Sequence, residues 1–135
     1  MFRISPHLIY WRHIPELYRL EGFECTKCGK VYFPKKYVCH ECGFEGKLKP
    51  KKLSGKGTVI TYTKVYSGVP DPFQIQAPYT LAVVELDEGP KILSQIVDCE
   101  DGTIKIGLRV KAVIRRLYTD GKTGLVYYGF KFKPI

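Results

Sequence analysis

The sequence predicts a mainly β protein with an N-terminal helical arm, a metal-bound ribbon and a C-terminal five-stranded barrel. Three observations lead to this prediction. Apolar residues follow a helix-start signal at Ser5-Pro6, two C-x-x-C pairs lie ten residues apart, and five short β-rich runs separated by turn residues fill the rest of the chain. We expect the arm at 1–22, the ribbon at 23–50 and the barrel at 51–135.

Length and composition set the class of protein. The chain has 135 residues, of which 44% are hydrophobic and 26% charged, values typical of a globular protein that buries a core. No apolar run approaches the roughly 18 residues that span a bilayer, and residues 1–13 lack the apolar stretch of a secretion signal. We therefore expect a cytoplasmic protein with no membrane partner.

Positive charge is concentrated in the first part of the chain. There are 22 Lys and Arg against 13 Asp and Glu, giving a formal net charge of +9. Residues 1–57 hold 12 basic and 5 acidic residues, whereas residues 58–135 hold 10 and 8. Four metal-bound thiolates with a divalent ion would lower the total to about +7. Such a charge normally suggests a polyanionic partner, but after this correction the chain is only moderately basic.

The arm is predicted to be helical. Pro6 suits the first helical position after Ser5, and Pro15 is expected to divide the helix into two pieces. Apolar residues run from Leu8 to Leu20 around much of the circumference, so the arm must pack on its own chain or contribute to a binding groove or partner interface.

The ribbon prediction rests on Cys25, Cys28, Cys39 and Cys42, each pair being followed by glycine. Such turns aim two sulfurs at one ion, and four thiolates favour tetrahedral zinc, with iron second. A disulfide framework fits poorly because the cysteine count is odd and no secretion signal precedes it. Since four ligands leave no open position, we interpret the metal as structural, with His40 as a less favoured alternative ligand.

Residues 31–36, between the two pairs, predict a short hairpin with exposed aromatic and basic side chains that could form a contact surface. Residues 47–52 then read as a basic linker. Beyond it, alternating or β-rich runs predict five strands, at 58–66, 79–86, 91–97, 109–117 and 125–132. Among small closed barrels of this size, the OB-fold is the favoured architecture.

Two features of the barrel segment carry no clear role in sequence. The loop at 67–78 contains three prolines and is either a binding loop or a stiff cover. Cys99 lies among Asp98, Glu100 and Asp101, whose charges should raise its thiol pKa and make it a poor nucleophile.

The order of these motifs resembles a known family. The segment 11–22 (WRHIPELYRLEG), the two C-x-x-C-G turns around Tyr32-Phe33-Pro34, the segment 54–57 (SGKG) and the segment 128–132 (YGFKF) are similar to the acyl-CoA-associated zinc-ribbon/OB-fold family, catalogued as domain of unknown function thirty-five. The resemblance covers almost the whole chain and is closest to the stand-alone archaeal type.

This resemblance implies a helical arm, a rubredoxin-like zinc ribbon with Cys25, Cys28, Cys39 and Cys42 as ligands, and an OB barrel. It also implies a non-catalytic subunit that joins a thiolase and hydroxymethylglutaryl-CoA synthase in the archaeal mevalonate route and helps to hold the CoA thioester.

For this scaffold hypothesis, CoA or acyl-CoA is the expected ligand. Phosphate contacts are expected from Arg12, Lys35 and Lys36. An apolar wall is expected from Tyr10, Trp11 and Phe33.

Two other functions remain open. OB barrels and zinc ribbons bind single-stranded nucleic acid, and Tyr62, Tyr66, Tyr127 and Tyr128 could stack on bases. The weak charge of the barrel segment argues against nucleic acid as a partner. A rubredoxin-like site holding iron would instead transfer electrons. An independent enzyme is the weakest hypothesis, because the three histidines have no evident catalytic partner in sequence.

Overall fold

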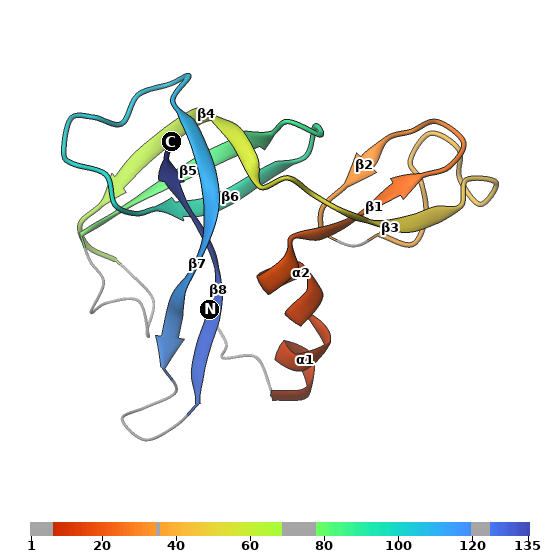
Figure 1. Ribbon diagram of the computed structural model, residues 1–135, viewed down its shortest axis with the longest axis horizontal. Coiled ribbons are helices and arrows are strands. Elements are labelled where there is room, and N and C mark those ends of the chain that lie inside the picture. The colour runs from red at the N-terminus through yellow and green to blue at the C-terminus, as the bar shows by residue number, and fades with distance from the viewer. Residues whose placement is uncertain (1–6, 35, 69–77, 120–124) are drawn as a thin grey trace.

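The computed structural model describes residues 7–34, 36–68, 78–119 and 125–135. Two short helices precede a ribbon and a barrel (Figure 1). The elements are α1 His7–Arg12, α2 Ile14–Arg19, β1 Glu21–Cys25, β2 Val31–Tyr32, β3 Leu48–Lys52, β4 Lys56–Val65, β5 Tyr79–Leu86, β6 Lys91–Ile96, β7 Arg109–Thr119 and β8 Val126–Pro134.

The arm is helical and divided as predicted. The two helices meet at His13, and Pro15 lies in the first turn of α2, where its missing N–H costs no helical hydrogen bond. Leu20 ends α2 in the left-handed conformation with φ 48°. The helix-start signal at 5–6 lies outside the described residues. Among those described, no helix is long and apolar enough to cross a membrane.

The ribbon is a three-stranded sheet in the order β2-β1-β3. The segment expected as a basic linker is instead mostly strand: β3 pairs with β1 from Leu48 opposite Cys25 to Lys52 opposite Glu21. Lysines and a proline at 50 suit this segment because β3 is an edge strand, where one side of the backbone needs no ladder partner. The domain boundary between ribbon and barrel that we expect after residue 50 stays a prediction. The strand β3 continues past this position to Lys52.

The barrel is closed, with strand order β4-β5-β6-β8-β7, and β7 returns to pair with β4. This is a five-stranded barrel of the predicted OB type, and all five predicted strands form within it. The parallel contact between β6 and β8, at Ile96 and Phe132, completes the circuit. Most of the 67–78 loop, residues 69–77, lies outside the described residues.

One hydrophobic core joins the three parts of the chain. The side chains of Val84, Val110 and Phe132 in the barrel are fully buried. Leu20 at the end of the arm and Leu53 at the exit from the ribbon belong to the same cluster. The arm and the ribbon are therefore fixed to the barrel by shared apolar packing rather than by a flexible tether.

The β7–β8 hairpin extends past the body of the barrel on the side where the helices lie (Figure 1). Contacts between α2 and β8 fix the arm against this hairpin. The ring of Tyr10 meets that of Tyr127 edge to face, with centroids 4.6 Å apart. The arm thus packs on its own chain, one of the two alternatives that the sequence left open, while part of α1 stays exposed.

Candidate metal centre and interaction surfaces

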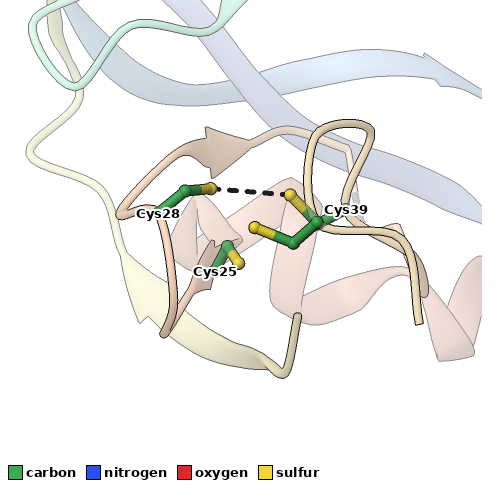
Figure 2. Close-up of side chains that lie close together, drawn as sticks. Cys25, Cys28 and Cys39 are labelled. Carbon is green, nitrogen blue, oxygen red and sulfur yellow. Dashed lines mark hydrogen bonds between the residues drawn. The ribbon is translucent and has the colours of Figure 1, made fainter. Parts of the chain in front are cut away.

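Four cysteine sulfurs converge in the ribbon. Cys25 ends β1, Cys28 follows in the turn after it, and Cys39 and Cys42 belong to a second turn. Their sulfur atoms all lie within 4.8 Å of one another. Figure 2 shows Cys25, Cys28 and Cys39 close together, with a dashed line between the sulfurs of Cys28 and Cys39. The structure thus brings together the complete predicted ligand set.

The two turns use the same backbone device. Gly29 has φ 78° and donates its N–H to the carbonyl of Cys25 at 2.9 Å. Gly43 has φ 58° and donates to the carbonyl of Cys39 at the same distance. Positive φ is readily available only to glycine, so the glycine after each pair closes the turn that gathers the two sulfurs.

The geometry and the donor set fit zinc. A tetrahedral ion with bonds of about 2.3 Å to sulfur places its ligands about 3.8 Å apart, and Cys28 and Cys39 are separated by 3.5 Å. Gly46 packs directly behind the cluster: a Cβ at this position would lie 2.9 Å from the sulfur of Cys25 and 2.8 Å from the Cβ of Cys42. Four thiolates fill a tetrahedral shell, so the ion that fits here is structural.

The four thiols are electrostatically unequal. A hydrogen bond from Tyr32, followed by backbone N–H groups, lowers the pKa of Cys39 to about 6. Burial, followed by the neighbouring sulfurs, raises the pKa of Cys42 to about 12. Four thiolates cannot share this space without a compensating cation, and a divalent metal supplies that charge.

Tyr32 is an additional residue of this centre. Its hydroxyl lies 3.3 Å from the sulfur of Cys39 and accepts the backbone N–H of His40 at 3.0 Å, so its own proton is available to the sulfur. The expectation that the aromatics between the pairs are exposed is wrong here, because only 6% of Tyr32 is accessible. The strand β2 is too short to show an alternation that would have revealed this burial.

The residues predicted to contact CoA do not form one cluster. Tyr10 packs against β8, while Trp11 and Arg12 line an open pocket of about 730 Å³ together with Tyr37 from the ribbon. Phe33 and Lys36 line a separate pocket between the ribbon and the β5–β6 turn. Neither pocket is lined by all of the described residues that were predicted to contact CoA.

Phe33 and Lys36, which line the second of these pockets, are also held by contacts within the protein. The ring of Phe33 packs edge to face on Phe130 at 5.8 Å, against the barrel core. Lys36 donates from its ammonium to His40 Nε2 at 2.8 Å and lies over the ring of Tyr32. Lys35 lies outside the described residues.

The barrel tyrosines differ in accessibility. Tyr62, Tyr66 and Tyr128 are 42%, 70% and 43% exposed, whereas Tyr127 is 1% exposed and cannot serve as the stacking platform considered from the sequence. Cys99 behaves as expected: burial first, and then the charges of Asp101 and Glu100, raise its pKa.

Comparisons with known proteins agree with this architecture. Residues 12–48 match the family described as ChsH2, rubredoxin-like zinc ribbon domain, and residues 51–115 match ChsH2, C-terminal OB-fold domain. A protein of Methanocaldococcus jannaschii named DUF35 domain-containing scaffold protein is 49% identical over 125 residues, which cover 93% of this chain and 88% of that protein. This chain belongs to the DUF35 family.

More distant relatives of this DUF35 protein carry the names of enzymes or enzyme subunits. Benzoylsuccinyl-CoA thiolase subunit BbsA of Thauera aromatica is 26% identical over 117 residues, covering 86% of this chain and 76% of that protein. The solved structure described as Ltp2-ChsH2(DUF35) aldolase has a TM-score of 0.70 at 23% identity and covers 99% of this chain and 98% of the other. That likeness establishes the shared fold.

Proposed function

We propose that this DUF35 protein is a non-catalytic, cytoplasmic scaffolding subunit that binds a CoA thioester and associates with a thiolase and hydroxymethylglutaryl-CoA synthase. The scaffold name of its archaeal relative and the thiolase-subunit name of BbsA support the general role. The thiolase, the synthase and the CoA thioester are the specific elements of the proposal.

The observation that carries the proposal is the exposed apolar face of the arm. Leu8 and Trp11 lie three positions apart on α1, on one side of the helix, and are 72% and 69% exposed, whereas Tyr10 of the same helix packs on the barrel. Large apolar side chains gathered on a rigid element are typical of protein interfaces, where aromatic residues dominate the binding energy. We assign this face to the thiolase.

The adjoining pocket has the chemistry of a CoA thioester site. Ile9, Trp11 and Tyr37 supply an apolar wall that suits a pantetheine chain, and Arg12 and Arg19 supply guanidinium groups that suit phosphates. We therefore assign the thioester to this pocket, which takes Trp11 and Arg12 from the predicted set. Tyr10 and Phe33 instead support the arm and the ribbon from within.

A non-catalytic role is consistent with the described side chains. The four ribbon cysteines fit a closed metal shell. His13 is engaged with Glu16 at 3.1 Å, and His40 with Lys36. The raised pKa of Cys99, caused first by burial, disfavours a thiolate nucleophile there.

Affinity purification from native extract tests the association. Tagged wild-type protein should recover a thiolase and hydroxymethylglutaryl-CoA synthase in stoichiometric amounts, identified by mass spectrometry. Trp11→Glu should lose the thiolase. Leu93→Glu is the matched control, because Leu93 is 67% exposed on the barrel and should retain it. Equal recovery by both variants would overturn the assignment of the arm face.

Ligand retention is a separate measurement. Acyl-CoA bound to the purified complex should be detected by chromatography, and Arg12→Gln should reduce the retained amount by roughly tenfold if a charge-assisted phosphate contact is lost. Lys105→Gln removes an exposed charge outside the pocket and should leave retention unchanged. Retention that is unaffected by Arg12→Gln would reject this pocket as the phosphate site.

A further inference from the structure

A cleft with a volume of about 440 Å³ separates the ribbon from the turn between β5 and β6. The strand of the ribbon that faces this turn is β2, which is an edge strand of the ribbon sheet (Figure 1). Residues 30–33, which comprise β2 and one residue on either side of it, all line the cleft, and the turn at 88–91 supplies the opposite wall. The cleft therefore runs along the outer edge of β2.

The backbone of Val31 directs its polar groups to this outer edge. Cys25 of β1 donates its N–H to the carbonyl of Lys30 at 2.9 Å, and the next pair along the ladder is Glu24 with Val31. Hydrogen-bonded pairs alternate with non-bonded pairs in an antiparallel ladder, so the N–H and the carbonyl of Val31 point away from β1. No other described strand pairs with β2. Such an edge is a template for one more strand.

The cleft has the size and the walls for an extended chain. From the rise along a strand and the spacings within and between sheets, one strand residue occupies roughly 160 Å³, so the cleft has room for about three residues. Phe33 from the ribbon and Pro90 from the turn add apolar side chains to the lining. A segment in this position would combine backbone pairing with apolar contacts.

Positive charge lies on both walls of the cleft. Lys30 and Lys36 of the ribbon both place their Nζ atoms over the ring of Tyr32, at 5.7 and 5.2 Å from its centroid. Lys91 lies on the opposite wall, at the end of the turn. The described lining holds lysines and no arginine. Lysines bind as separate point charges on flexible stems, which suits carboxylates spaced along a chain.

Carboxylates of the protein leave these ammonium groups available. Among the described residues, Lys36 and Lys91 form no ion pair, and Lys30 reaches Glu41 only at 3.6 Å on the exposed surface, where such a pair contributes little. Glu88 is the acidic residue of the described lining, and its Oε1 already accepts a backbone N–H from the start of the barrel segment at 2.7 Å. The charge that complements the cleft is therefore negative.

We propose that this cleft binds an extended acidic segment of a partner protein, which adds as a strand to the outer edge of β2. The backbone of the segment bonds Val31, and its carboxylates pair with Lys36 and Lys91. Successive side chains of a strand point to opposite faces, so acidic residues that alternate with apolar ones direct charge to the lysines and apolar groups to Phe33.

This inference goes beyond the scaffolding role and does not rest on it. The cleft shares no residue with the exposed face of the arm or with the pocket assigned to the thioester. Loss of thiolase binding or of acyl-CoA retention would therefore leave the proposal for the cleft intact.

Fluorescence anisotropy of the full chain with a labelled peptide of alternating valine and glutamate tests the proposal. Ionic strength is held constant, so that screening does not change. We expect saturable binding of one peptide per chain and an affinity at least roughly tenfold lower in Lys91→Glu, which replaces attraction by repulsion. Lys105→Glu is the matched control, because it makes the same change of net charge at an exposed site outside the cleft and should keep wild-type affinity.

A second variant separates binding from folding. Lys91 lies opposite Glu85 in the pairing of β5 with β6, so an acidic residue at this position also repels a neighbour within the barrel. Lys91→Gln removes the charge without adding that repulsion, and it should weaken the peptide by a smaller factor while the melting temperature without peptide stays that of wild type.

Strand pairing has its own measurement. The same peptide with N-methylated amide groups keeps its side chains and charge but cannot donate to β2, so it should bind at least roughly tenfold more weakly. With the unmodified peptide, hydrogen exchange at the N–H of Val31 should slow. The N–H of Tyr32, which already lies in the ladder with β1, should exchange at an unchanged rate.

Four results would overturn the proposal. The first is binding that does not saturate, and the second is equal weakening by Lys91→Glu and Lys105→Glu. The third is equal affinity for the N-methylated peptide or for a peptide of alternating valine and lysine. The fourth is displacement of the peptide by CoA at concentrations lower than those at which the peptide itself binds, which would identify the cleft as a site for a small anion.

Discussion

The hydroxyl of Tyr10 bonds both backbone polar groups of Tyr128, although 118 residues separate them in the chain. Tyr10 donates its proton to the carbonyl oxygen at 2.7 Å and accepts the N–H at 3.0 Å. Because that proton is used, the hydroxyl of Tyr18, 2.7 Å away, must be the donor in its own bond to Tyr10. One side chain thus takes the place of a neighbouring strand along this part of β8 and holds the arm in position.

Tyr10→Phe should therefore loosen the arm. The substitution removes three hydrogen bonds while retaining the ring that packs on Tyr127, and we expect a loss of about 1–3 kcal/mol in the free energy of unfolding. Trp11 is the single tryptophan, so its fluorescence during urea denaturation reports on the arm. Tyr62→Phe, which alters an exposed hydroxyl on β4, should have little effect; equal losses in both variants would contradict the role of Tyr10.

Metal removal should unfold the ribbon. The small ribbon cluster consists mainly of the ligands themselves with Tyr32 and Leu48, so chelation should remove its main source of stability. We expect one zinc per chain by elemental analysis and no visible absorption, and Cys42→Ser should lower the zinc content sharply. Cys99→Ser changes a cysteine outside the cluster and should leave one zinc per chain. Stoichiometric iron with a visible spectrum would instead support the electron-transfer hypothesis.

Gly46→Ala should disrupt the metal centre without removing a ligand. The added methyl group would lie 2.9 Å from the sulfur of Cys25 and 3.1 Å from the Cβ of Cys39, so the second turn must shift. We expect zinc to be lost to a competing chelator at least roughly tenfold faster. Gly102→Ala is the control: its φ of 89° strains an alanine too, but this strain lies in a barrel loop outside the metal cluster and should leave zinc release unchanged.

Tyr32→Phe should weaken metal retention by a different route. The variant keeps the buried ring but removes the hydroxyl beside Cys39, a group that favours the thiolate over the thiol. Partners outside the ligand shell typically contribute about 10- to 100-fold to metal affinity, which sets the expected loss in a competition titration. An affinity equal to that of wild type would show that Tyr32 only fills space.

Asp87→Asn should produce a pH-dependent loss of stability. The two terminal nitrogens of the Arg109 guanidinium donate to Asp87, at 2.7 and 3.0 Å, and these hydrogen bonds hold the carboxyl pKa below its usual value of 3.8. The unfolded chain therefore binds the proton more readily, so the stabilisation is complete above about pH 5 and is lost as the pH falls through the lowered pKa. The difference in melting temperature between wild type and Asp87→Asn should be largest near neutral pH and should vanish in strong acid. Glu85→Gln, an exposed change on β5, should show no such trend.

Local spacing was sufficient to predict much of this fold. The four metal ligands, the division of the arm near Pro15 and the hairpin of β5 and β6 all depend on contacts between residues close in sequence. A C-x-x-C-G turn gathers its sulfurs whatever surrounds it, and a proline interrupts a helix for reasons internal to the backbone. These features could be read directly from the order of residues.

Contacts across the closed barrel could not be predicted in this way. The expected CoA set placed Tyr10 and Phe33 on a ligand wall because they lie near the ribbon in sequence, whereas both rings pack on side chains of β8. The net charge of the barrel segment likewise gave no sign of a basic cluster, because its basic and acidic residues nearly cancel in number. The pairing of β7 with β8 then brought Arg116 and Lys131 into the lining of one barrel pocket.

The sequence by itself determined the ligand set of the metal centre, the five strands of the barrel and the order of the three parts. The tertiary structure decided which faces remain free, since Tyr32 is buried by the ribbon and Trp11 is left exposed by the arm. The physical reason is that ligand spacing and turn conformation are local properties, whereas burial and charge clustering depend on how distant segments meet once the barrel has closed.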